Sequence, residues 1–575
     1  MRKILALILC TLLLIPCLTS CIGIRPNAKD KGAEIPVHLT TEIYNLDPAY
    51  AYLDDAGAKI LSLIYEGLFT LNSDGKAVKA LCKDYKTYTN RDGEFVAEFT
   101  LKQTKWSDGR SINANDFVYA WKRIMEPEFN SKAASLLFDV KNARACKNGD
   151  ISIDDFGVVA SETRVLQVTF THKIDINEFI KTLASPALVP LREDKANRLD
   201  DWASYYATMV TNGPFYVKTF IPGEGEMVLE RSIYYYRDIE SETQALDKYV
   251  KPYRINITMG DTEDAMLSYG EGNLVFNSQI PLSARASINA TKLDTLSTAT
   301  YVFNSQRAPF DNADVRRGLS LAIDRAELAS IITYAKAAEG FIPNRITDKT
   351  GSDSFRENGG ALISATADMA EAKKLVSAAE DKEISITIRD NEVDRAVAEY
   401  VKGQWEQLGF TVEIVAVTFE HYTNIEYDQY RDLLYTAYST RDFDVIAIDS
   451  QMLSTDAFNE LASYAKPFSG GAMDLASGNF DAVTNLSGYS SEEYDALIEE
   501  AFAAEDKATR SELLHKAEEM LVRDMPAAPL FVYENAYVKN KDLSKLTTDY
   551  FGSVLFDGAK LANYSRFKPV EENAE

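Results

Sequence analysis

Segments in which hydrophobic and polar residues alternate recur in the first two hundred residues of the chain. Residues 95–101 and 164–170 both carry a hydrophobic side chain at every second position. This period of two is typical of β-strands with one face buried. We therefore expect the first part of the chain to be a mixed region with several strands.

The hydrophobic period changes to that of helices from about residue 310. Residues 315–330 predict a helix, and Asp311 and Asn312 before it provide an N-cap. Further helices are expected at 367–378, 491–502 and 510–523, with a turn at 505–507 and a strand at 530–533.

A strand–helix–strand unit lies between these helices. Ile384, Ile386 and Ile388 alternate along the first strand, residues 393–408 have helical spacing, and Gly409 ends the helix. A second strand begins at Val412. Because two strands joined by a helix are usually parallel with a right-handed crossover, this unit indicates an α/β class.

The N-terminus has the pattern of an export signal. Two basic residues precede a hydrophobic run over 4–16, which is too short to span a bilayer comfortably. The run ends in Leu18-Thr19-Ser20-Cys21, which resembles the lipobox of bacterial lipoproteins. We expect residues 1–20 to be removed, Cys21 to carry lipid and residues 21–34 to form a flexible tether. The alternative is an ordinary secretory signal with a coincidental cysteine.

Composition and net charge limit the classes of molecule that the protein can bind. The 575 residues include 61 Lys and Arg against 87 Asp and Glu, a net charge of -26, which argues against nucleic acid as a partner. Of the five cysteines, only Cys82 and Cys146 lie beyond the signal and the lipid site. They form either one disulfide or two buried thiols.

Motifs for catalysis and metal binding are missing from the sequence. Its four histidines are not spaced as metal ligands, and it contains no nucleophile elbow and no phosphate-binding glycine loop. These missing motifs are a first indication of a binding protein, for which we expect no cofactor, no metal and no enzymatic activity. A hydrolase whose site is assembled from distant residues stays open as an alternative.

Several motifs, in order and over most of the chain, resemble those of family 5 of the extracytoplasmic solute-binding proteins, which serve ABC importers of oligopeptides, dipeptides and nickel. The motifs are Leu46-Asp47-Pro48, residues 64–69, 99–121, 212–215, 229–236, 304–325 and 488–526. The resemblance implies an α/β, two-lobed periplasmic-binding-protein-like fold of the hinge-closing type II, with an extra inserted domain.

The same resemblance implies domain bounds. Lobe I would comprise residues 35–69, 196–303 and 538–575, the inserted domain residues 70–195, and lobe II residues 304–537.

The function implied by the resemblance is capture of a peptide ligand outside the cell, followed by delivery to an ABC permease in the membrane through hinge closure. The protein would be a monomer, anchored to the cell membrane by lipid. Open alternatives are a peptide-signal receptor or adhesin without transport, a binder of a sugar or metal chelate, and a structural lipoprotein.

The resemblance to the family also indicates candidate binding residues. The loop after Pro48 nominates Tyr52 and Asp54, with a solvated acidic turn as the alternative. Tyr301 and Tyr533 could each offer a ring and a hydroxyl to the ligand or belong to the core.

Residues 443–448 resemble the buried strand that leads into the peptide-binding loop of the family. Peptide receptors often continue with a Gly-Trp pair and an Asp before a Pro, whereas this chain lacks the Trp and the Pro. The segment instead nominates Asp449, Ser450, Gln451 and Asp456. Asp449 or Asp456 could pair with a ligand amine, and Asp456 could alternatively cap the following helix.

Overall fold

The structure is a computed structural model. It describes residues 31–53, 55–129, 131–197, 202–236, 248–351, 353–423, 428–468, 485 and 487–567. No helix in these ranges is long and hydrophobic enough to cross a membrane.

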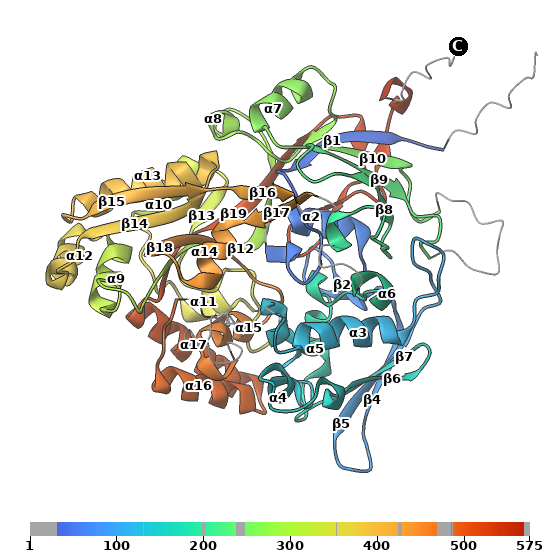
Figure 1. Cartoon of the computed structure of the whole chain (residues 1–575), viewed down its shortest axis with the longest axis horizontal. Coiled ribbons are helices and arrows are strands. Elements are labelled where there is room, and N and C mark those ends of the chain that lie inside the picture. The colour runs from blue at the N-terminus through green and yellow to red at the C-terminus, as the bar shows by residue number, and fades with distance from the viewer. Residues whose placement is uncertain are drawn as a thin grey trace, which may run out of the picture.

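Two long antiparallel strands run through the centre of the molecule and connect its two parts (Figure 1). They are β12 (Thr291–Phe303) and β19 (Ala527–Lys539), each of 13 residues. They lie in one large sheet with the order β15-β14-β18-β12-β19-β11-β1-β10-β9-β8, in which β13 pairs with β19. Both parts of the molecule therefore share one continuous sheet.

The part around β1 is called the first lobe. Its strands and helices are β1 (Glu34–Thr40), β8 (Phe215–Phe220), β9 (Glu226–Arg231), β10 (Arg254–Met259), β11 (Phe276–Asn277), α2 (Asp55–Ile64), α7 (Thr262–Gly270) and α8 (Leu282–Arg285), with the short 3₁₀ helix η1 (Ala51–Leu53) before α2. Short strand pairs near the C-terminus are β20 (Leu543–Ser544) with β23 (Lys560–Leu561), and β21 (Thr547–Thr548) with β22 (Val554–Leu555).

The part around β14 is called the second lobe. Its strands are β13 (Ala335–Ala337), β14 (Glu383–Arg389), β15 (Thr411–Val417), β16 (Phe419–Thr423), β17 (Asp428–Asp432) and β18 (Val445–Gln451). Its helices are α9 (Ala313–Leu321), α10 (Arg325–Ile332), α11 (Phe355–Gly359), α12 (Met369–Leu375), α13 (Glu392–Glu406), α14 (Leu433–Thr440), α15 (Ala457–Leu461), α16 (Glu492–Ala503) and α17 (Lys507–Asp524).

A separate four-stranded antiparallel sheet, with the order β4-β5-β7-β6, forms with its helices the small-sheet region (Figure 1). Its elements are β4 (Cys82–Thr89), β5 (Phe95–Leu101), β6 (Val158–Glu162), β7 (Val165–Thr169), α3 (Ala114–Met125), α4 (Ala143–Lys147), α5 (Ile176–Thr182) and α6 (Glu193–Ala196), preceded by the pair β2 (Phe69–Leu71) and β3 (Ala77–Lys79). The domain bounds derived from the sequence stay a prediction.

The core of the second lobe shows why its elements form. The isoleucines of β14 are buried on one side against Val397, Val401 and Trp405 of α13. Gly409, with a φ of +90°, ends the helix, and β15 then pairs in parallel with β14. The predicted strand–helix–strand unit is therefore confirmed, as are the strands β5 and β7.

Two helix predictions need correction. The single helix expected over 315–330 is two helices, because Asp324 accepts a hydrogen bond from the backbone of Glu327 and caps a new helix. The helix expected from residue 510 begins at Lys507, because Asp506 is its N-cap and accepts from Thr509. In both places a capping aspartate sets the helix start.

Candidate functional site

The end of β18 presents an unpaired strand edge. β12 pairs with β18 from Val445 to Gln451, whereas β14 pairs only with Val445 and Ile446. Among the residues that the structure describes, no strand pairs with that second edge from Ala447 onward. Backbone N–H and C=O groups along such an edge can accept an additional extended strand.

This edge lies where the lobes meet. β18 contacts η1 of the first lobe, so residues far apart in the chain lie side by side. Nearby, Phe419 of β16 packs against Tyr44 of the first lobe with 4.1 Å between ring centroids. The guanidinium of Arg389, at the end of β14, lies 4.7 Å from the Phe419 centroid. A segment added to β18 would therefore be enclosed by both lobes.

Tyrosines from both lobes gather beside this boundary. Tyr50 of the first lobe and Tyr435, Tyr438 and Tyr464 of the second are half-buried. Burial raises the pKa of Tyr435 to about 12. Burial chiefly, and then charges that include that of Tyr435, raise the pKa of Tyr50 as well. Rings with nearby hydroxyls can both stack on and hydrogen-bond to a ligand.

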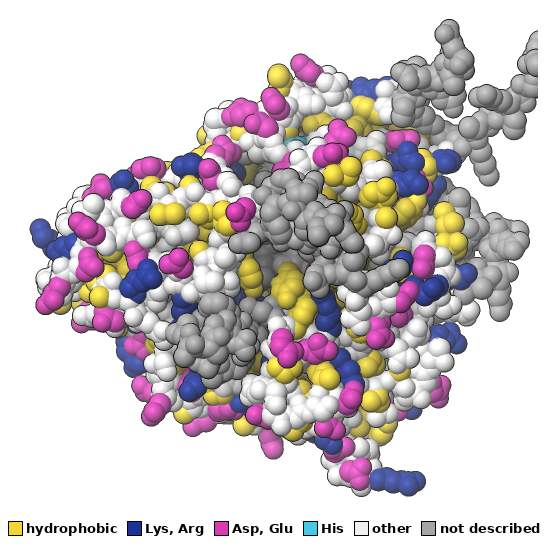
Figure 2. Space-filling view, viewed as in Figure 1, with side chains coloured by type: hydrophobic (Ala, Val, Ile, Leu, Met, Phe, Trp, Pro, Cys, Tyr) yellow, Lys and Arg dark blue, Asp and Glu magenta, His cyan; other side chains and the backbone are white. Residues whose placement is uncertain are grey.

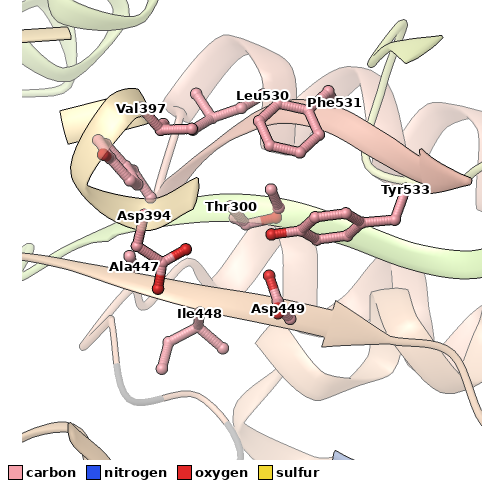
Figure 3. Close-up of a pocket in the computed structure, with 11 residues that line it drawn as sticks. Thr300, Asp394, Val397, Ala447, Ile448, Asp449, Leu530, Phe531 and Tyr533 are labelled. Atoms are coloured by element: carbon pink, nitrogen blue, oxygen red, sulfur yellow. The ribbon is translucent and has the colours of Figure 1, made fainter. Parts of the chain in front are cut away.

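A small cavity of about 10 Å³ lies between α13 and the face of the sheet that this helix covers (Figure 3). Its lining includes Tyr301 of β12, Asp394 of α13, Asp449 of β18, and Phe531 and Tyr533 of β19. In Figure 3 the ring of Tyr533 extends toward Asp449, while Asp394 approaches from the helix. The cavity has room for about one water molecule.

The two carboxyl groups of this cavity are electrostatically unfavourable neighbours. Burial, and then the charge of Asp394, raise the pKa of Asp449, which the hydrogen bond from Tyr533 partly opposes. Burial also raises the pKa of Asp394. Asp449 is nevertheless exposed and Asp394 half-buried. A carboxyl group that is crowded by protein yet open to solvent lies on the wall of a recess.

Ion pairs join the second lobe to the small-sheet region. Lys132 lies 2.5 Å from Glu460, which also accepts a hydrogen bond from the Ser450 hydroxyl at 2.6 Å. Arg144 pairs with Glu499 at 2.5 Å. Because these partners are more than 300 residues apart, such bridges hold the regions together across the boundary. Figure 2 shows acidic and basic side chains interleaved over the face of the molecule that it displays.

The structure brings three of the nominated residues together. Asp449, Tyr301 and Tyr533 line the same cavity. Tyr301 is 2% exposed and packs edge-on against Trp405, so it belongs to the core although it also lines the cavity. Asp449 and Tyr533 are more accessible.

The other described candidates lie elsewhere around β18. The Ser450 hydroxyl is engaged by Glu460, and the Gln451 side chain donates to the carbonyl of Met452. Asp456 caps α15 by accepting from Phe458 and pairs with Arg510 at 2.7 Å. Tyr52 is buried, with its hydroxyl 3.4 Å from that of Ser131.

Two nominated positions, Asp54 and the lipidation residue Cys21, lie outside the described residues. Cys82 and Cys146 are both buried free thiols, so of the two alternatives left open for this pair the structure contains the thiols.

Sequence reasoning missed Asp394, Tyr435 and Glu460. A usable signal existed for Asp394, because it lies in the first turn of a helix that follows a parallel strand. Ligands of α/β proteins bind near the carboxyl ends of such strands. No comparable signal marked Glu460, whose partner Lys132 belongs to another region.

Comparison with known proteins agrees with this architecture. The dipeptide-binding protein DppE of Bacillus subtilis is 26% identical to this chain over 92% of this chain and 93% of DppE. The structure of the Escherichia coli murein tripeptide binding protein MppA matches with a TM-score of 0.75 at 21% identity, covering 92% of this chain and 98% of MppA.

The unliganded open form of MppA matches less well, with a TM-score of 0.57 at 21% identity over 92% of this chain and 97% of that one. The model of the bacterial extracellular solute-binding proteins, family 5, matches residues 76–466. With its two lobes around a continuous sheet, the chain therefore belongs to family 5 of the bacterial extracellular solute-binding proteins.

Proposed function

We propose that this protein is a lipid-anchored receptor that captures oligopeptides outside the cytoplasmic membrane and delivers them to an ABC importer. The observation that carries the proposal is the unpaired edge of β18 at the lobe boundary. An extended peptide placed there would add a strand to the sheet, with main-chain hydrogen bonds that tolerate many side chains. DppE and MppA, whose names state peptide ligands, share the fold family.

The central strands supply the hinge in this proposal. β12 and β19 belong to both lobes, so bending them would separate η1 from β18 and open the peptide site. The bridges Lys132–Glu460 and Arg144–Glu499 would form on closure. Peptide contacts to both lobes would favour the closed form, which is the form a permease would recognise.

Anchoring rests on the sequence alone. Leu18-Thr19-Ser20-Cys21 would direct cleavage before Cys21 and attachment of lipid to its thiol. Labelling of the expressed protein with a clickable fatty acid tests this step. Cys21→Ala should abolish the label, and a label that persists in the variant would contradict the assignment.

Native mass spectrometry of the gently purified protein, followed by denaturing analysis of what it releases, tests the ligand class. We expect co-purified peptides of a narrow length range. A released peptide would then be resynthesised with N-methyl groups at single positions. Because β-type pairing uses alternate backbone N–H groups, methylation should weaken binding at alternate positions and spare those between.

Absence of bound peptide, together with no thermal stabilisation by a mixed peptide library, would contradict the peptide assignment and favour a sugar or metal chelate. Delivery is tested separately. Uptake of a radiolabelled ligand peptide should fall in cells that lack this protein. Unchanged uptake together with a lost transcriptional response to the peptide would favour a signal receptor.

A further inference from the structure

The chain enters the first lobe through a segment that is held by several hydrogen bonds. The ammonium group of Lys31, the first residue that the structure describes, donates to the Tyr253 hydroxyl at 3.1 Å, and the carbonyl of Lys31 accepts from Arg231 at 2.7 Å. The backbone of Tyr253 in turn donates to Ala33. Lys31 follows Cys21 by ten positions. Because an extended chain spans at most about 3.6 Å per residue, a lipid on Cys21 would keep Lys31 within about 36 Å of the membrane.

Exposed lysines surround this entry point. Arg231, which holds the carbonyl of Lys31, also donates to the carbonyls of Val250 and Lys251, both at 3.2 Å. Residues 248–251 are therefore fixed beside the start of the lobe. In Figure 2, basic and hydrophobic side chains gather at the upper right, over β8 to β10 of Figure 1. The tether face is defined as the exposed residues Lys31, Lys248, Tyr249, Lys251, Lys545 and Lys560.

The C-terminal strand pair brings two of these lysines to the tether face. The backbone of Lys251 donates to the carbonyl of Asp557 at 2.7 Å. Gly558, the next residue, lies against the carbonyl of Lys545. Lys560 follows in β23, which pairs with β20 just before Lys545. Lysines from three remote segments of the chain therefore share one end of the first lobe.

Three acidic side chains that adjoin the tether face are paired or buried. Glu230 pairs with Arg254 at 2.6 Å and accepts a hydrogen bond from the Tyr253 hydroxyl. Glu34 is 8% exposed. Asp557 is half-buried, and burial raises its pKa. These acids leave the outward charge of the tether face positive.

The acidity of the whole protein does not cancel this local charge. The net charge of -26 is spread over the whole chain, and charges beyond the Debye length of about 8 Å are largely screened at physiological ionic strength. A flat surface would therefore interact mainly with the face that touches it. Tyr249 is 42% exposed, and the Lys248 ammonium lies 5.0 Å from the centroid of its ring. Tyrosine and lysine together are typical of residues at the headgroup level of membranes.

We propose that the tether face is a docking surface for anionic lipid headgroups, which orients the first lobe against the membrane beside the lipid anchor. The lysine ammonium groups pair with lipid phosphates, and the ring of Tyr249 lies among the headgroups. The lipid on Cys21 holds the protein at the membrane, whereas the tether face sets which side of the protein faces it. This inference rests on the lipid anchor of the proposed function.

Lysine footprinting on vesicles tests the inference. The mature lipidated protein would be reconstituted into vesicles of phosphatidylcholine, with or without about 30% phosphatidylglycerol, and acetylated with a water-soluble reagent. Mass spectrometry should show labelling of Lys31, Lys545 and Lys560 at least about threefold lower on the anionic vesicles. Labelling of Lys83 and Lys373, which lie outside the tether face, should not change. About 0.5 M NaCl should restore the labelling, because salt screens the attraction.

Two charge-reversed variants separate the tether face from the net charge. K248E/K251E/K560E should lose the protection of Lys31 and Lys545 while it stays anchored to the vesicles. K83E/K173E/K373E is the matched control, because it makes the same change of charge at exposed lysines elsewhere, and it should keep the protection. Both variants should melt at the wild-type temperature, since all of the replaced side chains are exposed.

Several results would overturn the inference. Equal labelling of the tether face on neutral and anionic vesicles would leave the lipid anchor intact and exclude the docking surface. Protection that persists in K248E/K251E/K560E, or that extends equally to Lys83 and Lys373, would do the same. Protection on intact cells but not on anionic vesicles would assign the tether face to a protein partner instead. Release of the protein from neutral vesicles would reject the lipid anchor and the docking surface together.

Discussion

Two pairs of charged side chains in the second lobe differ in whether each charge has a partner of opposite sign. This difference separates a structural role from a binding role. Arg356 and Glu518 form an ion pair at 2% and 0% side-chain exposure. Arg356 also donates to the carbonyls of Ile342 and Gly360, and Glu518 accepts from the backbone of Ile342. Every charge there has a partner of opposite sign.

Asp394 and Asp449 line one cavity of the same lobe and form no ion pair among the described residues; Arg389, whose charge lowers the pKa of both, is paired with Asp432. A buried charge that is paired and hydrogen-bonded holds the fold together, whereas an unpaired one makes the ligand-free protein less stable. Carboxyl groups with strongly perturbed pKa values are frequent at binding and catalytic sites. The unpaired site is therefore the functional candidate.

The largest expected effect is the loss of folding stability when the Arg356–Glu518 ion pair is broken. R356M leaves Glu518 as an uncompensated buried anion, so it should lower the free energy of unfolding of the second lobe by about 3–5 kcal/mol. Denaturant unfolding measures the loss, with D92N, at an exposed acid in a β-hairpin turn, as the control. A loss as small as that of D92N would show that the Arg356–Glu518 pair does not stabilise the fold.

A matched pair of tyrosines gives an intermediate effect. Tyr494 is buried and donates to the Leu461 carbonyl at 2.7 Å, whereas the hydroxyl of the buried Tyr301 has no hydrogen-bond partner among the described residues. Y494F should destabilise the protein by about 1 kcal/mol, and Y301F should be neutral or slightly stabilising. Thermal unfolding of the two variants side by side measures both. An equal loss in both would show that the Tyr301 hydroxyl has a partner in solution.

Replacing Asp394 and Asp449 should change the stability in the opposite direction from breaking the Arg356–Glu518 pair. D394N/D449N removes the mutual repulsion, so the ligand-free variant should be more stable than wild type by less than about 1 kcal/mol, because the exposure of Asp449 screens the charge. The melting temperature without peptide measures this. Destabilisation would indicate that the carboxylates serve the fold.

The smallest effect is a pH dependence. The pKa values of Asp394 and Asp449 are raised by burial above the ordinary 3.8, so the folded protein holds protons that the unfolded chain releases. Stability from this pair is therefore present at low pH and declines as the pH rises above about 4. The melting temperature of the wild type should decline relative to that of D394N/D449N between pH 4 and 8, and parallel curves would contradict the assignment.

Local pattern was sufficient for much of the second lobe. The alternating isoleucines of β14, the helical spacing before Gly409 and the cap Asn312 all specify structure through neighbours in the chain. Where prediction was wrong, at Asp324 and Asp506, a capping residue within the expected pattern ended one element and began another. The spacing of hydrophobic residues alone does not reveal such a capping residue.

The candidate site was predictable only in part. Asp449 and Tyr533 were nominated from the resemblance of their segments to a family, and the structure places them in one cavity. Asp394 was absent from that set, because as part of an amphipathic helix it resembles any acid of a first helical turn. Asp394 becomes a candidate only because it lines the same cavity as Asp449, which is 55 positions away in the chain.

By itself, the sequence determined the signal-like N-terminus, the acidic charge, the α/β class and the order of family motifs, since each depends on composition or local spacing. Only the tertiary structure decided that no strand in the described part of the chain pairs with the second edge of β18 from Ala447 onward, and that η1 lies beside it. It alone placed two like charges and the buried Tyr301 side chain around one small cavity. The physical reason is that burial and electrostatic pairing depend on distances in space, which strands from remote segments set when they join one sheet.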